Sequence, residues 1–253
     1  GQLAHYEVIG RGRAVLFLHG WLGSWRYWVP AMQSIALTHR AYALDFWGFG
    51  DAANNKRYSF DDQLQLVEDF IDAMGIFNLT IVSHGLGAVI ACRMMKKHAA
   101  LIEKTIFISY PLHDDQFNKS LLLMEQSSLL DKLAGKGEDV EPVKKDALKN
   151  DPEALRVPLD EWTMNPSAFD IFQDQSKKLL IYGGRDPIVQ PPSVGLELDG
   201  QHTHWLVFEE SSHFPMLDQS SQFNRLLNDF LALDENEPLS SLSLKEHWRR
   251  RVR

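Results

Sequence analysis

Six short segments of the chain are almost continuously apolar, and each runs into glycine or polar residues. They are RAVLFLHG (13–20), RAYALDFWG (40–48), NLTIVSHG (78–85), KTIFISYP (104–111), KKLLIYGGRD (177–186) and HWLVFEESSH (204–213). A strand that alternates apolar and polar residues has one face in water, whereas a continuously apolar strand is covered on both faces. The pattern therefore predicts a mostly parallel sheet between layers of helices.

Amphipathic segments fill the gaps between these runs. Residues 59–75 read SFDDQLQLVEDFIDAMG, with Ser59 and Asp62 in capping-box spacing and Gly75 placed to end a helix. A second helix is predicted to begin at Gly85 and to continue through AVIACRMMKKH. The apolar stripe of the first helix consists of Leu64, Val67, Phe70, Ile71 and Met74. Alternation of strands and helices predicts an α/β fold with right-handed crossovers.

Residues 112–176 contain helical patches such as FNKSLLLMEQSSLLDKL but no strand-like run. The segment is too long for a plain connection in a compact domain, so it predicts a helical cap insertion over the carboxyl edge of the sheet. Its stretch GKGEDVEPVKKD predicts a mobile surface loop. The α/β core is then residues 1–111 and 177–233, and residues 234–253 form a polar tail that turns basic at its end.

The charge balance and the cysteine content exclude several classes of function. The 253 residues hold 26 basic and 34 acidic side chains, a net charge of −8, which argues against nucleic acid or an anionic membrane as the main partner. Cys92 is the only cysteine, so an internal disulfide and a Cys-rich zinc site are excluded, and we expect it to pack as a small apolar residue.

The same features set expectations for location and ligand. No run approaches the ~18 apolar residues of a membrane span, and no signal peptide is visible, so we expect a cytoplasmic protein. We expect no metal and no cofactor. A small molecule of apolar or aromatic character is the expected partner.

Five motifs carry a resemblance to a known family. LFLHGWLGS, LDFWGFGDA, IVSHGLGA, YGGRDPIVQP and SSHFPMLDQ stand in the order in which the α/β-hydrolase superfamily has them, and the chain resembles that superfamily over nearly its whole length. The resemblance implies an α/β-hydrolase fold, a mostly parallel sheet flanked by helices, with a helical cap insertion. It also implies descent from serine hydrolases that act on small esters, amides or carbon–carbon bonds.

The family's nucleophile elbow, G-x-S-x-G, needs small residues on both sides of the serine because strand and helix nearly touch there. In S-H-G-L-G, Ser83 and Gly87 meet that need, and Gly85 occupies the place of the serine. We expect Ser83 to be only the small residue that the turn requires. The resemblance implies that Asp186 is the acid and His213 the general base, in the chain order of this fold.

Two further sets of residues follow from the resemblance. The backbone N–H groups of Trp21 and Leu86 would form the oxyanion hole. Aromatic side chains from loops at the carboxyl ends of the strands would line an apolar pocket, although core packing is the alternative for some of them. The candidate substrate-binding residues are Trp25, Trp28, Trp47 and His84.

A glycine at the elbow predicts a chain that is severely impaired as a serine hydrolase, since loss of the nucleophile lowers turnover by roughly 10⁶. Gly85 could be engineered to trap a substrate or native to a ligand-binding or signalling domain. In a third explanation, His213 and Asp186 activate water or a substrate proton without a serine. Ser83 and Asp51, which also depart from the family's pattern, favour a native glycine. Because LAHYEVIGRGRAVLFLHG resembles the family's second and third strands, a longer parent chain is a further hypothesis.

Overall fold

A computed structural model describes residues 3–52, 56–133, 141–161, 175–192 and 200–244. Seven strands form one sheet in the order β1-β3-β2-β4-β5-β6-β7. β1 is antiparallel to β3, and every other pair of neighbours is parallel. The strands are β1 Tyr6–Gly10, β2 Arg13–Leu18, β3 His39–Leu44, β4 Leu79–His84, β5 Ile102–Ile108, β6 Lys177–Gly183 and β7 Thr203–Phe208. The predicted mostly parallel sheet is confirmed.

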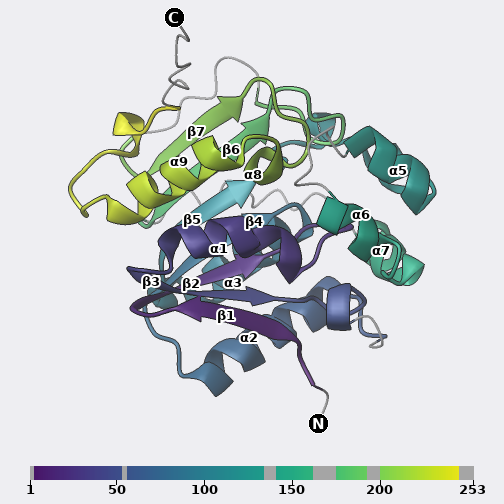
Figure 1. Ribbon diagram of the computed structural model, residues 1–253, viewed down its shortest axis with the longest axis horizontal. Helices are drawn as coiled ribbons and strands as arrows, with labels where there is room; N and C mark the ends of the chain where they lie inside the picture. Colours follow the sequence, from purple (N-terminus) through teal and green to yellow (C-terminus); the bar gives the residue numbers. More distant parts are fainter. Residues whose placement is uncertain (1–2, 53–55, 134–140, 162–174, 193–199, 245–253) are drawn as a thin grey trace, which may run out of the picture.

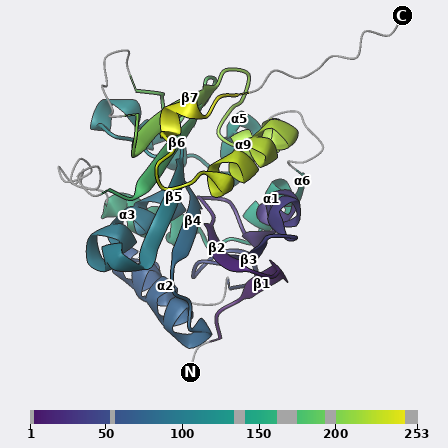
Figure 2. The same ribbon diagram turned by 90° about the vertical axis from the view of Figure 1, so that its left-hand side faces the viewer.

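Helices cover both faces of this sheet. Figures 1 and 2 show α1 and α9 on one face and α2 and α3 on the other. The core helices are α1 Val29–Ile35, α2 Phe60–Met74, α3 Leu86–His98, α8 Pro215–Asp218 and α9 Ser220–Ala232, and short 3₁₀ turns are η1 Trp25–Trp28, η2 Gly50–Ala52, η3 Ala99–Leu101 and η4 Asp114–Gln116. α2 begins and ends as predicted, because Ser59 accepts the backbone N–H of Asp62 and Gly75 adopts a φ of +60°.

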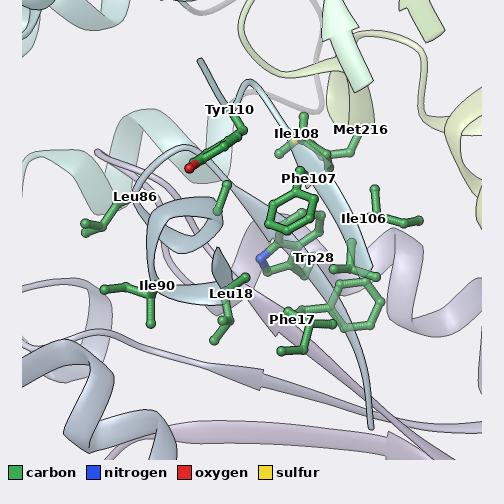
Figure 3. Close-up of a cluster of buried hydrophobic side chains, with 14 of the residues drawn as sticks. Phe17, Leu18, Trp28, Leu86, Ile90, Ile106, Phe107, Ile108, Tyr110 and Met216 are labelled. Carbon is green, nitrogen blue, oxygen red and sulfur yellow. The ribbon is translucent and has the colours of Figure 1, made fainter. Parts of the chain in front are cut away.

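The central strands are buried as their continuous apolar character predicts. Every residue of β4 and of β6 is buried. Buried side chains from β2, β5, α3 and the η1 turn pack around the central strands, with Phe17, Trp28, Ile90 and Phe107 among them (Figure 3). Burial of this kind contributes about 1.5–3 kcal/mol for each large apolar side chain.

Between β5 and β6, the described residues form the α-helices α4 Lys119–Leu122, α5 Gln126–Leu133, α6 Glu141–Ala147 and α7 Pro152–Asp160. Figure 1 shows α5, α6 and α7 at the end of the sheet toward which the parallel strands point. The Gly50 N–H donates to Asn150 Oδ1 at 3.2 Å and the Asp151 N–H donates to the Gly48 carbonyl at 2.9 Å. The inserted helices are therefore hydrogen-bonded to the loop that follows β3.

The structure corrects two predictions at the margins of the core. The second half of GKGEDVEPVKKD forms α6, in which Val143 and Asp146 are buried, because Asp146 pairs with Arg26 of η1. In the predicted tail, residues Leu239–Ser241 form a 3₁₀ turn (η7) whose Leu239 is fully buried, and the Leu239 N–H donates to the Gln201 carbonyl. Residues 135–140 and the basic segment 245–253 lie outside the described residues.

None of the helices that the structure describes combines the length and the apolar character that a membrane crossing requires.

Candidate active site

Gly85 forms the turn between β4 and α3. Its φ of +50° and ψ of −110° lie in a region that residues with a Cβ rarely adopt, and its N–H donates to the Ile108 carbonyl at 3.0 Å. A Cβ on Gly87 would lie 2.5 Å from the Leu18 carbonyl oxygen, so only glycine fits there. The turn is thus the tight strand-to-helix elbow that the motif predicts.

The space at the tip of the elbow admits a side chain. A Cβ built on Gly85 would lie 3.4 Å from Cε3 of Trp21 and 3.5 Å from Cα of Gly20, which are ordinary van der Waals contacts. A residue with a Cβ would therefore meet the strain of the positive φ, of the order of 1–3 kcal/mol, but no collision.

Ser83 lies inside the sheet. It is fully buried, and its hydroxyl donates to the Ile106 carbonyl of β5 at 2.8 Å. A hydroxyl that is engaged with the neighbouring strand is not presented at the tip of the turn, which supports the interpretation of Ser83 as a small structural residue.

Asp186 and His213 meet as the motifs predict. Asp186 Oδ2 lies 2.8 Å from Nδ1 of His213, and both side chains are almost fully buried. The same oxygen accepts the Ser109 hydroxyl at 2.9 Å, and Oδ1 accepts the N–H groups of Ile188 and Val189 at 2.8 and 3.2 Å. With four donors around it, the carboxylate is fixed in orientation and in turn fixes the imidazole ring.

The protonation of His213 follows from this contact. A carboxylate can only accept, so Nδ1 carries the proton, and the neutral ring has its lone pair on Nε2. Nε2 is buried and has no hydrogen-bond partner among the residues that the structure describes. A neutral imidazole nitrogen with a free lone pair can accept a proton or a hydrogen bond.

His84 is held by hydrogen bonds at both ring nitrogens. Its Nε2 donates to the His213 carbonyl at 2.9 Å, and its Nδ1 lies 3.1 Å from the Tyr27 hydroxyl, which accepts the Gly20 N–H at 2.6 Å. Burial, together with the neighbouring His213, holds the pKa of His84 well below its ordinary value. These hydrogen bonds give His84 a structural role, because they tie the loop that holds His213 to the loop after β2. A substrate contact at His84 stays a prediction.

The structure places the three tryptophans predicted to bind substrate in different surroundings. Trp28 is fully buried with its ring 5.2 Å from that of Phe17, so it is a core residue and not a pocket residue (Figure 3). Trp25 donates from Nε1 to Asp51 at 3.1 Å, at a polar cluster beside β3. Trp47 is buried, and both its backbone N–H and its carbonyl are hydrogen-bonded by Gln63 of α2.

Trp21 lies against the elbow itself. Its ring is the nearest side chain to a Cβ on Gly85, and it stacks on Phe117 with centroids 6.1 Å apart. Phe117 pairs with Val189, three residues after Asp186. Leu86, the other predicted oxyanion donor, is the first residue of α3, where N–H groups have no partner within the helix. Apolar rings therefore cover the predicted site.

A cluster of His5, Asp45 and Asp51 brings possible metal-ligand atoms within 4.8 Å of one another. Hydrogen bonds account for the arrangement: Asp45 accepts from His5 and from the Asp51 N–H, and Asp51 pairs with Arg26 at 2.8 Å. Burial raises the pKa of Asp45. Asp51, which departs from the family's pattern, thus pairs with Arg26, and Arg26 also pairs with Asp146 of α6.

Motif-based reasoning missed Ser109 and Tyr27. Ser109 was visible as the first polar residue after the apolar run IFI of β5, at the carboxyl edge where site residues gather. Tyr27 had no distinguishing signal, because a tyrosine inside WRYW looks like a packing residue.

Comparison with known proteins places these motifs in a family. A model of the Alpha/beta hydrolase family matches residues 15–226. The 2-hydroxy-6-oxo-6-phenylhexa-2,4-dienoate hydrolase of Comamonas testosteroni is 25% identical over 270 residues, covering 90% of this chain and 91% of that protein. "Probable lysophospholipase BODYGUARD 3" of Arabidopsis thaliana is 26% identical over 106 residues, which cover 39% of this chain and only 21% of that relative's length.

A solved structure shows the same fold. The enol-lactonase of Burkholderia xenovorans LB400 superposes with a TM-score of 0.77 at 15% identity, covering 91% of this chain and 96% of that one. The family model spans most of the residues between β2 and α9, including the elbow, Asp186 and His213. The chain therefore belongs to the alpha/beta hydrolase family.

Proposed function

We propose that this chain binds a small carbonyl compound, such as an ester, an amide or a compound with a cleavable carbon–carbon bond, and that it is severely impaired as a serine hydrolase. Gly85 carries the proposal, because the tip of the elbow has no side chain that could form an acyl-enzyme. The rest of the machinery supports binding at the same place: Asp186 orients His213, and the N–H groups of Trp21 and Leu86 are the expected oxyanion donors.

The class of ligand is supported by the chemistry around the elbow and by the relatives. The stacked rings of Trp21 and Phe117 favour an apolar or aromatic group next to the carbonyl. The Comamonas relative is named for a phenyl-bearing keto acid and the Burkholderia structure for an enol lactone. A cytoplasmic location is part of the proposal and is supported by the single cysteine, Cys92, which is buried in α3.

A second candidate is proton transfer without a serine. The observation that favours it is Nε2 of His213, which is buried and unpaired among the described residues while Asp186 holds Nδ1. Such a dyad is a general base that could take a proton from a bound ligand.

The first test restores the serine. Gly85→Ser is expected to become labelled by a serine-directed phosphonate and to hydrolyse short activated esters on the order of 10² to 10³ times faster than the unmodified chain, since the Cβ fits and the dyad is in place. Intact-protein mass spectrometry and a chromogenic ester assay measure the two effects.

Gly85→Ser combined with His213→Ala is the matched control and is expected to lose both gains. Circular dichroism confirms that each variant is folded. A folded Gly85→Ser chain that resists the phosphonate would show that the site is not an intact hydrolase site, and labelling of the unmodified chain would refute its impairment.

A further inference from the structure

The tip of the elbow at Gly85 has room for a Cβ. Replacing a serine side chain by hydrogen frees about 30 Å³, the volume of one water molecule. The nearest atoms to a Cβ on Gly85, in Trp21 and Gly20, begin at 3.4 Å, so the neighbours leave room for a Cβ at this position. A side-chain atom at position 85 does not collide with the ring of Trp21.

His213 packs against His84, the residue that precedes Gly85. Its ring centroid is 4.6 Å from that of His84, the residue next to Gly85, and its carbonyl is hydrogen-bonded to that ring. Nε2 of His213 is buried, and it is unpaired within the described part of the chain. A buried nitrogen without a hydrogen-bond partner is destabilising, and a hydrogen-bonded water removes that cost.

A water at this position also has donors nearby. Leu86 begins α3 immediately after Gly85, and the N–H groups of a helix's first turn point away from its body without helical partners. The water would accept from such an N–H and donate to Nε2, which gives it the two or more polar partners that a buried water requires. His213 and Trp21 are each at most 2% exposed, so bulk solvent does not compete.

We propose that a water molecule held in the place of the serine hydroxyl is the nucleophile, and that the chain hydrolyses activated esters slowly in one step without an acyl-enzyme. This inference rests on the proposed binding of a carbonyl compound. It replaces the covalent route by general-base catalysis, which contributes typically 10²- to 10⁴-fold.

The oxygen of the water forms a bond to the carbonyl carbon while His213 Nε2 takes one of its protons, and the carbonyl π electrons move onto the carbonyl oxygen. When that electron pair returns, the bond to the leaving oxygen breaks, and the imidazolium gives its proton to that oxygen. One ester and one water become one acid and one alcohol, and Asp186 supports the transient positive charge on the ring throughout.

The experiment compares the unmodified chain with Gly85→Ala and His213→Gln, using p-nitrophenyl acetate with and without methanol. A methyl group at position 85 fills the proposed water position, so both variants are expected to lose at least about tenfold of the rate above background. The unmodified chain should show no burst and no acyl-enzyme mass, and methanol, which is small enough to replace the water, should divert part of the product to methyl acetate.

Gly75→Ala is the matched control. Gly75 has a φ of +60°, but a Cβ there meets nothing within 4 Å, so the variant carries the same kind of backbone strain far from the dyad. We expect it to keep the full rate. If Gly85→Ala does not fold, His213→Gln carries the comparison alone.

The outcomes separate this inference from the proposed function. Equal rates in the unmodified chain, Gly85→Ala and His213→Gln overturn the water nucleophile, while a labelled and active Gly85→Ser would leave the proposed function standing. A burst or an acyl-enzyme mass in the unmodified chain overturns both.

Discussion

At the scale of single residues, Gly85 and Ser109 both have a positive φ. Their φ angles are +50° and +51°. Glycine adopts this region freely, whereas a residue with a Cβ is strained there by about 1–2 kcal/mol. Ser109 tolerates the strain because its N–H donates to the Ile181 carbonyl and its hydroxyl to Asp186. Strained residues of this kind cluster at functional sites.

Two substitutions at Ser109 separate strain from hydrogen bonding. Ser109→Ala loses the hydroxyl and keeps the strain, whereas Ser109→Gly loses both. We expect the glycine variant to be more stable than the alanine variant by about 1 kcal/mol in urea unfolding. An alanine variant as stable as the glycine variant would show that the positive φ at position 109 is not strained.

His84 makes the fold sensitive to acid. Burial holds its pKa in the folded chain well below the ordinary value of 6.5, so at intermediate pH the unfolded chain binds a proton that the folded chain does not. The free energy of unfolding should therefore be constant above neutral pH and should fall as the pH drops below about 6.5, by about 1.4 kcal/mol for each unit of separation between the two pKa values.

Urea unfolding at a series of pH values measures this loss. The His84→Gln variant, which cannot titrate at this position, should start less stable but lose less between pH 7 and pH 5. A variant with the same pH slope as the unmodified chain would assign the acid sensitivity to other groups, such as His19, whose pKa burial also lowers.

At the scale of elements, α6 depends on one buried carboxylate. Asp146 is 2% exposed, pairs with Arg26 at 3.2 Å and accepts the Ser24 hydroxyl. Arg26 continues the contact to Asp51 beside β3. Without this network, a seven-residue helix with two lysines, one glutamate and one aspartate would have few contacts that hold it against η1. The network explains why a segment with the composition of a loop is helical and packed.

Asp146→Ala is expected to lower the free energy of unfolding by about 2 kcal/mol, because it removes charge-assisted hydrogen bonds and leaves Arg26 with fewer partners. Asp146→Asn, which keeps an acceptor for Ser24, should lose about half as much. Asp160→Ala is the control, since Asp160 is 59% exposed in its pair with Arg156 and should change stability by less than about 0.5 kcal/mol. An Asp146→Ala chain as stable as that control would contradict the anchoring role.

At the scale of the whole molecule, the strands and the order of the motifs were predictable. Each of the six apolar runs contains or overlaps one parallel strand, because a strand covered on both faces requires apolar residues at every position. The elbow was predictable because its turn requires a glycine at position 87, where a Cβ would collide with the Leu18 carbonyl, and the motif shows that glycine. The order of the motifs implied the contact between Asp186 and His213. The four donors around the Asp186 carboxylate were not predictable, because one of them, Ser109, lies 77 residues away in the sequence.

The sequence by itself determined the class of fold and the elbow and indicated that Asp186 and His213 belong together, because periodicity and short motifs act over a few residues. Tertiary structure decided which side chains face the site. The motifs place Trp28 and His84 near the predicted site. In the structure, Trp28 packs against Phe17, and His84 is hydrogen-bonded to the His213 carbonyl, so both have structural roles. Packing and hydrogen bonding join residues far apart in the chain, so they follow from the folded arrangement and not from local pattern.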